Sequence, residues 1–99
     1  MAKFYLTNKA VKDLANIWNY TFETWSENQA DNYYQTLLEN CQDIAENPLI
    51  GKAYFSVAKS LLGLHVNKHI IFYRKVSEDY IEITRILHEM MDLKSHLIE

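Results

Sequence analysis

The first half of the chain carries two stretches of apolar residues at helical spacing. The first runs from residue 8 to about residue 25, and Thr7 before it can cap the helix by accepting a backbone N–H. Apolar side chains that recur every three or four residues form the buried face of a helix. We expect that face to consist of Ala10, Leu14, Ile17, Trp18 and Trp25.

The second stretch begins at "SENQ" (26–29), whose S-x-x-Q form is that of a capping box. It ends at Asn47, because the residue before Pro48 is disfavoured in the α region. Almost no linker separates the two stretches, so they are predicted to fold back as an antiparallel helical hairpin. The buried face of the second helix is expected to comprise Ala30, Tyr34, Leu37, Leu38, Cys41, Ile44 and Ala45.

Stretches that favour β-strands precede and follow this hairpin in the sequence. Residues 3–6, 69–75 and 80–87 are rich in β-branched and aromatic side chains, and "VSED" between the last two stretches predicts a turn. The segment 62–67 ("LGLHVN") is a further candidate strand. The pattern of residues 53–63 fits either a short helix or irregular chain.

The chain closes with "DLKSHLIE", in which Asp92 is a candidate cap for a short C-terminal helix. The element order is therefore β-α-α-β-β-β. This order predicts an α+β fold in which the helical hairpin packs on one face of a small, mostly antiparallel sheet. The opposite face of the sheet is expected to stay partly open.

Composition narrows the class of protein. Ninety-nine residues are expected to form a single domain, residues 1–99. The lone cysteine, Cys41, excludes an internal disulfide, and its place among apolar helix positions predicts a core side chain. The start of the chain lacks the apolar core of a signal peptide, and no apolar run approaches the roughly 18 residues of a membrane helix, so a cytoplasmic location is expected.

The charge balance argues against nucleic acid as a direct target. The net charge is −3, with two arginines in the whole chain, whereas proteins that neutralise phosphates carry a basic surplus. Residues 1–50 hold three lysines and seven acidic residues, a net of −4. Residues 51–99 hold seven basic and six acidic residues, a net of +1, so a surface that meets acidic groups is expected there.

Motifs of phosphate-binding loops, zinc proteases, redox pairs and serine hydrolases are absent from the sequence. We therefore expect no cofactor. A metal would have to be bound by histidines that lie mostly among strand signals, so no metal site is expected either. These histidines are His65, His69, His88 and His96.

Arg85 and His88 form the one pair that suggests catalysis, since phosphodiester cleavage uses a general acid or base and a cation. Strict strand alternation puts Arg85 on a face with Ile81, Ile83 and Leu87. It puts His88 on the opposite face, so a shared active site requires a bulge. A strand-end histidine bonded to backbone or to an acid is the commoner outcome.

The apolar stripe of the first helix is wider than one sheet face can cover. Val11 and Phe22 lie on its flank, beside Trp18. Apolar surface left over on a small domain suggests a partner chain laid against it.

Four segments of the chain resemble the ParE toxin family. They are "LTNKAVKDLANIWNYT", "ENPLIGK", "HVNKHIIFYRK" and "IEITRILHEMMD", and they occur in the family's order and spacing over nearly the whole chain. One position departs from the family pattern, because Met90 stands where many members have arginine.

The resemblance implies the toxin of a bacterial type II toxin–antitoxin pair within the ParE/RelE superfamily. Members studied as ParE stabilise the cleaved-DNA complex of DNA gyrase, and ParD-like antitoxins with a ribbon-helix-helix part neutralise them. It implies a target-binding edge of Arg85, His88, Met91 and Asp92. We expect the antitoxin tail on Val11, Trp18 and Phe22.

Two alternatives stay open at this stage. The RelE branch shares the fold but cuts mRNA on the ribosome, which here would use Arg74, Arg85 and His88. The chain could also be an inactive module that only binds an antitoxin. The acidic composition favours the gyrase inhibitor over the nuclease.

Overall fold

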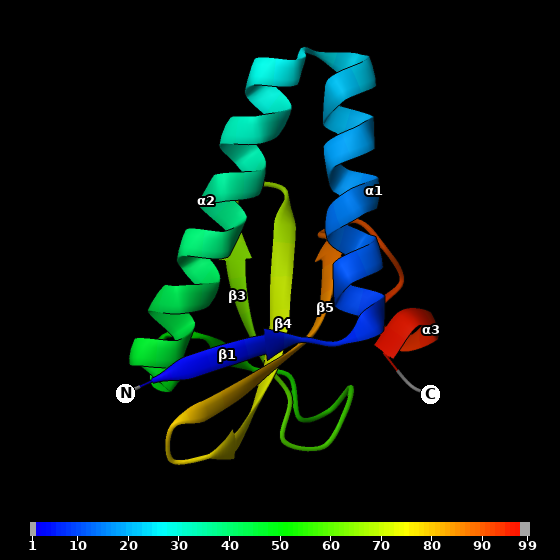
Figure 1. The fold of residues 1–99 in the computed structure, drawn as a ribbon. Helices are drawn as coiled ribbons and strands as arrows, with labels where there is room; N and C mark the ends of the chain where they lie inside the picture. The colour runs from blue at the N-terminus through cyan, green and yellow to red at the C-terminus, as the bar shows by residue number, and fades with distance from the viewer. Residues whose placement is uncertain (1, 98–99) are drawn as a thin grey trace.

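The computed structural model describes residues 2–97, which form a helical hairpin on one face of a five-stranded sheet (Figure 1). The predicted α+β fold and its element order are confirmed. The elements are β1 (Lys3–Leu6), α1 (Asn8–Thr24), α2 (Glu27–Glu46), the 3-10 turn η1 (Pro48–Ile50), β2 (Lys52–Ala53), β3 (Leu62–Val66), β4 (His69–Ser77), β5 (Tyr80–His88) and α3 (Leu93–Leu97). The strand order is β1-β5-β4-β3-β2; β1 pairs with β5 in parallel, and the other neighbouring pairs are antiparallel.

The helices begin where the sequence places their caps. The Thr7 hydroxyl accepts the N–H of Ala10 at 3.1 Å, and the Ser26 hydroxyl accepts the N–H of Gln29 at 3.1 Å. These bonds satisfy backbone donors that a helix start leaves unpaired. Figure 1 shows α1 and α2 side by side, with their connected end extending past the ends of β3, β4 and β5. No helix within residues 2–97 is long and apolar enough to cross a membrane.

The main core lies between the hairpin and the sheet. Cys41 is completely buried there, as predicted, and burial raises the pKa of its thiol to about 12. The thiol therefore stays protonated and packs as a small apolar group. The other buried members of this core are Ala10, Leu14, Leu37, Ile44, Ala45, Val66, Ile71, Tyr73, Ile81, Ile83 and Ile86.

A bulge in β5 changes which side chains of this strand face the helices. Phe72 pairs with Arg85 while Tyr73 pairs with Ile83, so Thr84 is the extra residue. Beyond the bulge the alternation is inverted, and Ile86 packs in the main core with Ile83. The prediction that Leu87 shares a face with Ile81 and Ile83, and that Ile86 and His88 lie opposite, was therefore wrong.

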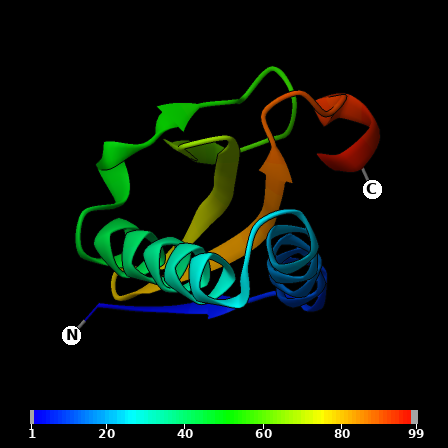
Figure 2. The ribbon, with the colours of Figure 1, turned by 90° about the horizontal axis from the view of Figure 1, so that it is seen from above.

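The other face of the sheet is also covered, contrary to the expectation that it stays partly open. Figure 2 shows the chain between β2 and β3, together with α3, on the side of the sheet away from the two long helices. A second apolar cluster lies beneath them, with Tyr54 edge-on to the ring of Phe72 at 5.1 Å. Its buried members are Leu61, Ile70, Phe72, Leu87 and Leu97.

Three aromatic residues do not lie in the core where the pattern placed them. Trp25 is 68% exposed, because α1 ends at Thr24 and its last turn lies beyond the sheet. Trp18 is half-buried on the flank of α1, and Tyr34 is exposed on α2. A helix presents a contiguous stripe, but tertiary packing covers only the part that meets a neighbour.

Tyr73 ties the turn after α2 to the sheet. Its hydroxyl donates to the carbonyl of Pro48 at 2.6 Å and accepts the N–H of Gly51 at 3.0 Å. Gly51 has no room for a side chain, because a Cβ there would meet the Tyr73 hydroxyl and approach the carbonyl oxygen of Gly63 to 2.8 Å.

Gly51→Ala is therefore expected to lower the free energy of unfolding by about 1–3 kcal/mol, measured by urea denaturation. Tyr73→Phe removes the colliding hydroxyl, so the cost of Gly51→Ala should be smaller in a Tyr73→Phe background. Strict additivity of the two substitutions would show that the contact is absent.

Candidate functional site

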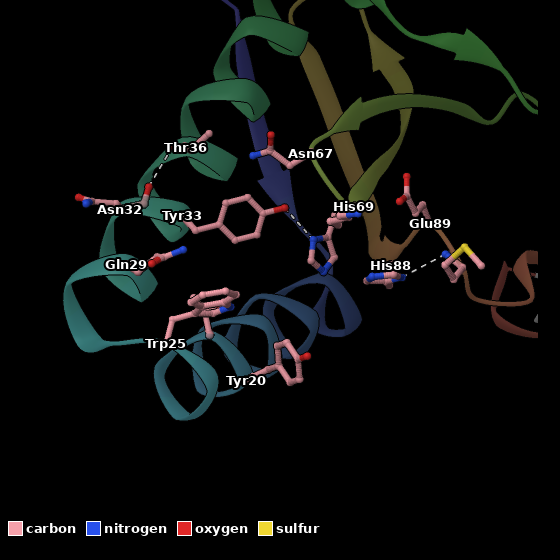
Figure 3. A pocket seen from close by; sticks show the side chains of 13 residues that line it. Tyr20, Trp25, Gln29, Asn32, Tyr33, Thr36, Asn67, His69, His88 and Glu89 are labelled. Carbon is pink, nitrogen blue, oxygen red and sulfur yellow. Dashed lines mark hydrogen bonds between the residues drawn. The ribbon is translucent and has the colours of Figure 1, made fainter.

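A cavity of about 680 Å³ lies between the connected end of the helical hairpin and the end of the sheet (Figure 3). Its walls come from four separate segments: the end of α1, the first turns of α2, the β3–β4 turn and the end of β5. The labelled lining residues are Tyr20, Trp25, Gln29, Asn32, Tyr33, Thr36, Asn67, His69, His88 and Glu89.

Two histidines face each other at the inner wall of this cavity. His69 on β4 pairs directly with His88 on β5, and the ring centroids lie 5.4 Å apart with the planes nearly perpendicular, at 83°. Burial, followed by repulsion from His88, lowers the pKa of His69 from 6.5 to about 4. His69 is therefore an uncharged imidazole near neutral pH.

Tyr33 of α2 points its hydroxyl at this pair (Figure 3). Its oxygen lies 2.7 Å from Nδ1 of His69 and 3.3 Å from the carbonyl oxygen of Val66. Burial raises the pKa of Tyr33, so the phenol keeps its proton. This contact joins α2 to the β3–β4 hairpin.

The carboxylate of Glu89, directly after β5, is bonded to a third histidine. Its Oε1 lies 2.6 Å from Nε2 of His65, and the backbone N–H of Glu89 donates to the carbonyl of Lys68 at 2.8 Å. The pair is partly exposed, so its net effect on stability is expected to be small.

Arg85 is bound to Asp13 of α1. The guanidinium donates to both carboxylate oxygens, from Nε at 2.8 Å and from Nη2 at 2.9 Å, and its Nη1 donates to the carbonyl of His96 at 3.1 Å. The Asp13 carboxylate also accepts the N–H of Ile86 at 3.0 Å. The side chains of Asp13 and Arg85 are 11% and 16% exposed, so this bidentate pair is largely withdrawn from water. Its bonds connect α1, β5 and α3.

The structure does not bring together Arg74, Arg85 and His88, the residues of the nuclease alternative. Arg74 lies five residues along β4 from His69, roughly 17 Å at the rise of a strand. Its Nε donates to the carbonyl of Lys59 on the sheet face away from the hairpin. Arg85 is held by Asp13, and His88 lies on the cavity.

The expected target-binding residues lie at the end of β5 and just after it. His88 holds the turn that follows, because its Nδ1 accepts the N–H of Met90 and its carbonyl accepts the N–H of Met91, both at 3.1 Å. Met90 is 82% exposed and Met91 is 39% exposed. Asp92 directly precedes α3, and its carboxylate accepts the Ser95 hydroxyl at 2.8 Å.

The expected antitoxin-binding residues Val11, Trp18 and Phe22 lie along one side of α1. Together with Ala15 they form a largely exposed stripe, hereafter the α1 stripe. Val11 and Phe22 are exposed, and Trp18 stacks on Phe22 with 5.3 Å between the ring centroids. The indole N–H of Trp18 donates to Asp31 of α2 at 2.9 Å, which fixes the ring on the surface.

Sequence reasoning missed Asp13, Tyr33 and His69 as parts of the site. Asp13 had a usable signal, because it is an acid beside the apolar helix face of Ala10 and Leu14, where burial requires a cationic partner. His69 and Tyr33 carried no comparable signal, because their meeting depends on the packing of α2 on the sheet.

The described residues contain no group of three potential ligands that could hold a metal ion. Moreover, Nδ1 of His88 already accepts a backbone N–H, and Nδ1 of His69 contacts the Tyr33 hydroxyl. The arrangement is suited to holding backbone and side chains in place.

Asp13→Ala is expected to lower the free energy of unfolding by about 3–5 kcal/mol, because it leaves the Arg85 guanidinium and the Ile86 N–H without this acceptor. Asp31→Ala is the matched control, since Asp31 makes an exposed contact to Trp18 and its loss should cost about 1 kcal/mol or less. Equal losses in denaturant melts would contradict the structural role of the Asp13–Arg85 pair.

Comparison with known proteins agrees with this fold. The family model described as the ParE toxin of the type II toxin–antitoxin system parDE matches residues 4–93. Toxin ParE1 of Mycobacterium tuberculosis (strain CDC 1551) is 31% identical over 96 residues, 97% of this chain and 98% of that protein. Toxin ParE1 of Caulobacter vibrioides is 31% identical over 97 residues, 98% of this chain and 99% of that protein.

Solved structures of toxin–antitoxin proteins have the same fold. The chromosomal ParDE system from P. aeruginosa contains a chain that superposes with a TM-score of 0.75 at 21% identity, over 89% of this chain and 96% of that chain. The complex RelBE2 from Mycobacterium tuberculosis contains one with a TM-score of 0.68 at 16% identity, over 89% and 98%. Together with the family match over residues 4–93, these findings show that the chain belongs to the ParE toxin family of type II toxin–antitoxin systems.

Proposed function

We propose that this toxin inhibits DNA gyrase by binding it, without catalysing a reaction of its own. The observation that carries the proposal is the separation of Arg74, Arg85 and His88, each of which already binds another group of the chain. A nuclease needs a cation and a general acid or base around one phosphate. Membership of the ParE family supports the gyrase target.

The target-binding edge in this proposal consists of the end of β5 and of residues 89–92. Residues 89–92 are hereafter called the 89–92 segment. Met91 and Asp92 offer an apolar and an anionic contact, while His88 shapes the turn. Arg85 contributes by anchoring α3 and α1 behind the segment, because its guanidinium is bound by Asp13 and by His96. Preorganised contact residues lose less conformational entropy on binding.

The antitoxin in this proposal is ParD-like, with a ribbon-helix-helix part, and its tail covers Val11, Trp18 and Phe22 of the α1 stripe. Exposed aromatic surface that is rigid before binding is typical of interface anchors. The stacking of Trp18 on Phe22 and its bond to Asp31 support such rigidity. The similarity to chains of solved toxin–antitoxin systems supports an antitoxin partner.

The proposal is tested with purified gyrase, relaxed plasmid and ATP. The toxin should reduce supercoiling and accumulate cleaved DNA, and Met91→Ala should raise the inhibitory concentration by about tenfold, the effect of one interface anchor. Val76→Ala is the control. Val76 is also exposed, but it lies near the end of β4 that is away from the 89–92 segment. Unchanged supercoiling and no cleaved DNA would reject gyrase as the target.

Induction of the toxin in cells separates the two rivals. Primer extension on translated mRNA should show intact message, whereas induced cuts would favour the ribosome-dependent nuclease. Normal growth after induction without antitoxin would instead favour an inactive antitoxin-binding module.

The antitoxin surface is tested by affinity measurements with the antitoxin encoded beside the toxin. Phe22→Ala should weaken binding by about tenfold, because it removes an exposed aromatic contact and the stacking partner of Trp18. Lys12→Ala, on the same helix but off the α1 stripe, should leave affinity within about twofold. Equal affinities for all three proteins would place the antitoxin elsewhere.

A further inference from the structure

We infer that Tyr33 and His69 are positioning residues, which act through His88 on the 89–92 segment while His69 is uncharged. The inference concerns the conformation of this chain by itself. Its importance for gyrase rests on the proposed function, in which the 89–92 segment meets the target.

The first link is the turn after β5. The N–H of Met90 donates to Nδ1 of His88, and the N–H of Met91 donates to the His88 carbonyl. An imidazole nitrogen accepts a hydrogen bond only when it carries no proton. The turn therefore depends on a His88 ring that keeps Nδ1 directed at the Met90 N–H.

The second link is the contact between the two imidazoles. His69 lies directly across the sheet from His88, with its ring nearly perpendicular to that of His88. The contact limits the positions that the His88 ring can take, because side chains directly opposite in antiparallel strands touch. His69 is itself fixed by the Tyr33 hydroxyl, 2.7 Å from its Nδ1. A row of three side chains thus connects α2 to the segment (Figure 3).

The charged groups around this row would compensate a positive charge on His69 poorly. Glu89 is bonded to His65 of β3, and Asp13 of α1 is bonded to Arg85. The remaining titratable groups on the cavity are the cation Lys68 of the β3–β4 turn and the neutral phenols of Tyr20 and Tyr33. Glu89 raises the pKa of His69 slightly, but burial and His88 outweigh it and lower the value to about 4.

Acidification should therefore disrupt the contacts among Tyr33, His69 and His88. A proton on His69 would place a positive charge against the ring of His88, whose Nδ1 accepts the N–H of Met90. For His69, the unfolded chain binds more protons than the folded one between pH 6.5 and about 4. The stabilisation by neutral His69 is thus complete above pH 6.5 and is lost as the pH falls towards 4.

The test follows amide protection factors of the full chain by NMR at pH 7.5 and at pH 4, close to the pKa of His69. The Met90 and Met91 amides should lose protection by roughly threefold to tenfold at pH 4 relative to Ile71 in the core, as expected for loss of one hydrogen bond. His88→Asn supplies a neutral amide oxygen as acceptor, so its Met90 amide should keep the same protection at both pH values.

Tyr33→Phe should lower protection of the same two amides at pH 7.5, by about threefold, since it frees His69. Tyr34→Phe is the matched control, because the adjacent tyrosine is exposed, does not line the cavity and should change neither amide. The inference is overturned if Met90 and Met91 protection is independent of pH in the wild type, or if Tyr33→Phe lowers all amides in proportion. These readouts need no gyrase, so they stand even if gyrase is not the target.

Discussion

A carboxylate of α1 and a guanidinium of β5 meet in a largely buried, two-bonded pair, and the rest of the structure is arranged around that contact. Asp13 fixes the start of α1 against β5, and Arg85 in turn holds the His96 carbonyl in α3. Helices α1 and α3, which lie on opposite faces of the sheet, are thus connected through the side chain of Arg85. Removing either partner would leave a poorly solvated charge, which is why the pair constrains the fold more strongly than an exposed ion pair does.

The bulge at Thr84 explains how Arg85 and the cavity side chains share one strand. It places two residues of β5 opposite one of β4, so that the strand inverts its alternation between Ile83 and Ile86. The inversion sends His88 to the face that the hairpin covers, where it meets His69. The same device separates His88 from Arg74, which lies on the far side of the sheet. A histidine that looked like half of a catalytic pair therefore belongs to a row of side chains in contact that ends in Tyr33.

Two exposed surfaces are consistent with the toxin family, and they are built differently. The α1 stripe is the part of the helix surface that the packing of α1 in the fold leaves accessible. The stacking of Trp18 on Phe22 makes it more rigid. The 89–92 segment is a turn held by backbone bonds to His88 and anchored behind by Arg85. The first surface was foreseen from the width of the apolar stripe. The second surface stays a predicted target-binding edge, and the anchoring of Arg85 by Asp13 behind it was not foreseen, because these two residues are distant in sequence.

Sequence by itself determined the helical hairpin, the strand order along the chain, the caps at Thr7 and Ser26 and the burial of Cys41. These features depend on periodicity and on residues within a few positions of one another. Family motifs distributed over the chain also determined its class. Tertiary structure alone decided the exposure of Trp25, the covering of the second sheet face, the pairing of Asp13 with Arg85 and the meeting of Tyr33, His69 and His88. Each of these depends on the register of strands and on which elements end beside one another, and a single bulged residue at Thr84 is enough to reverse the faces that local alternation predicts.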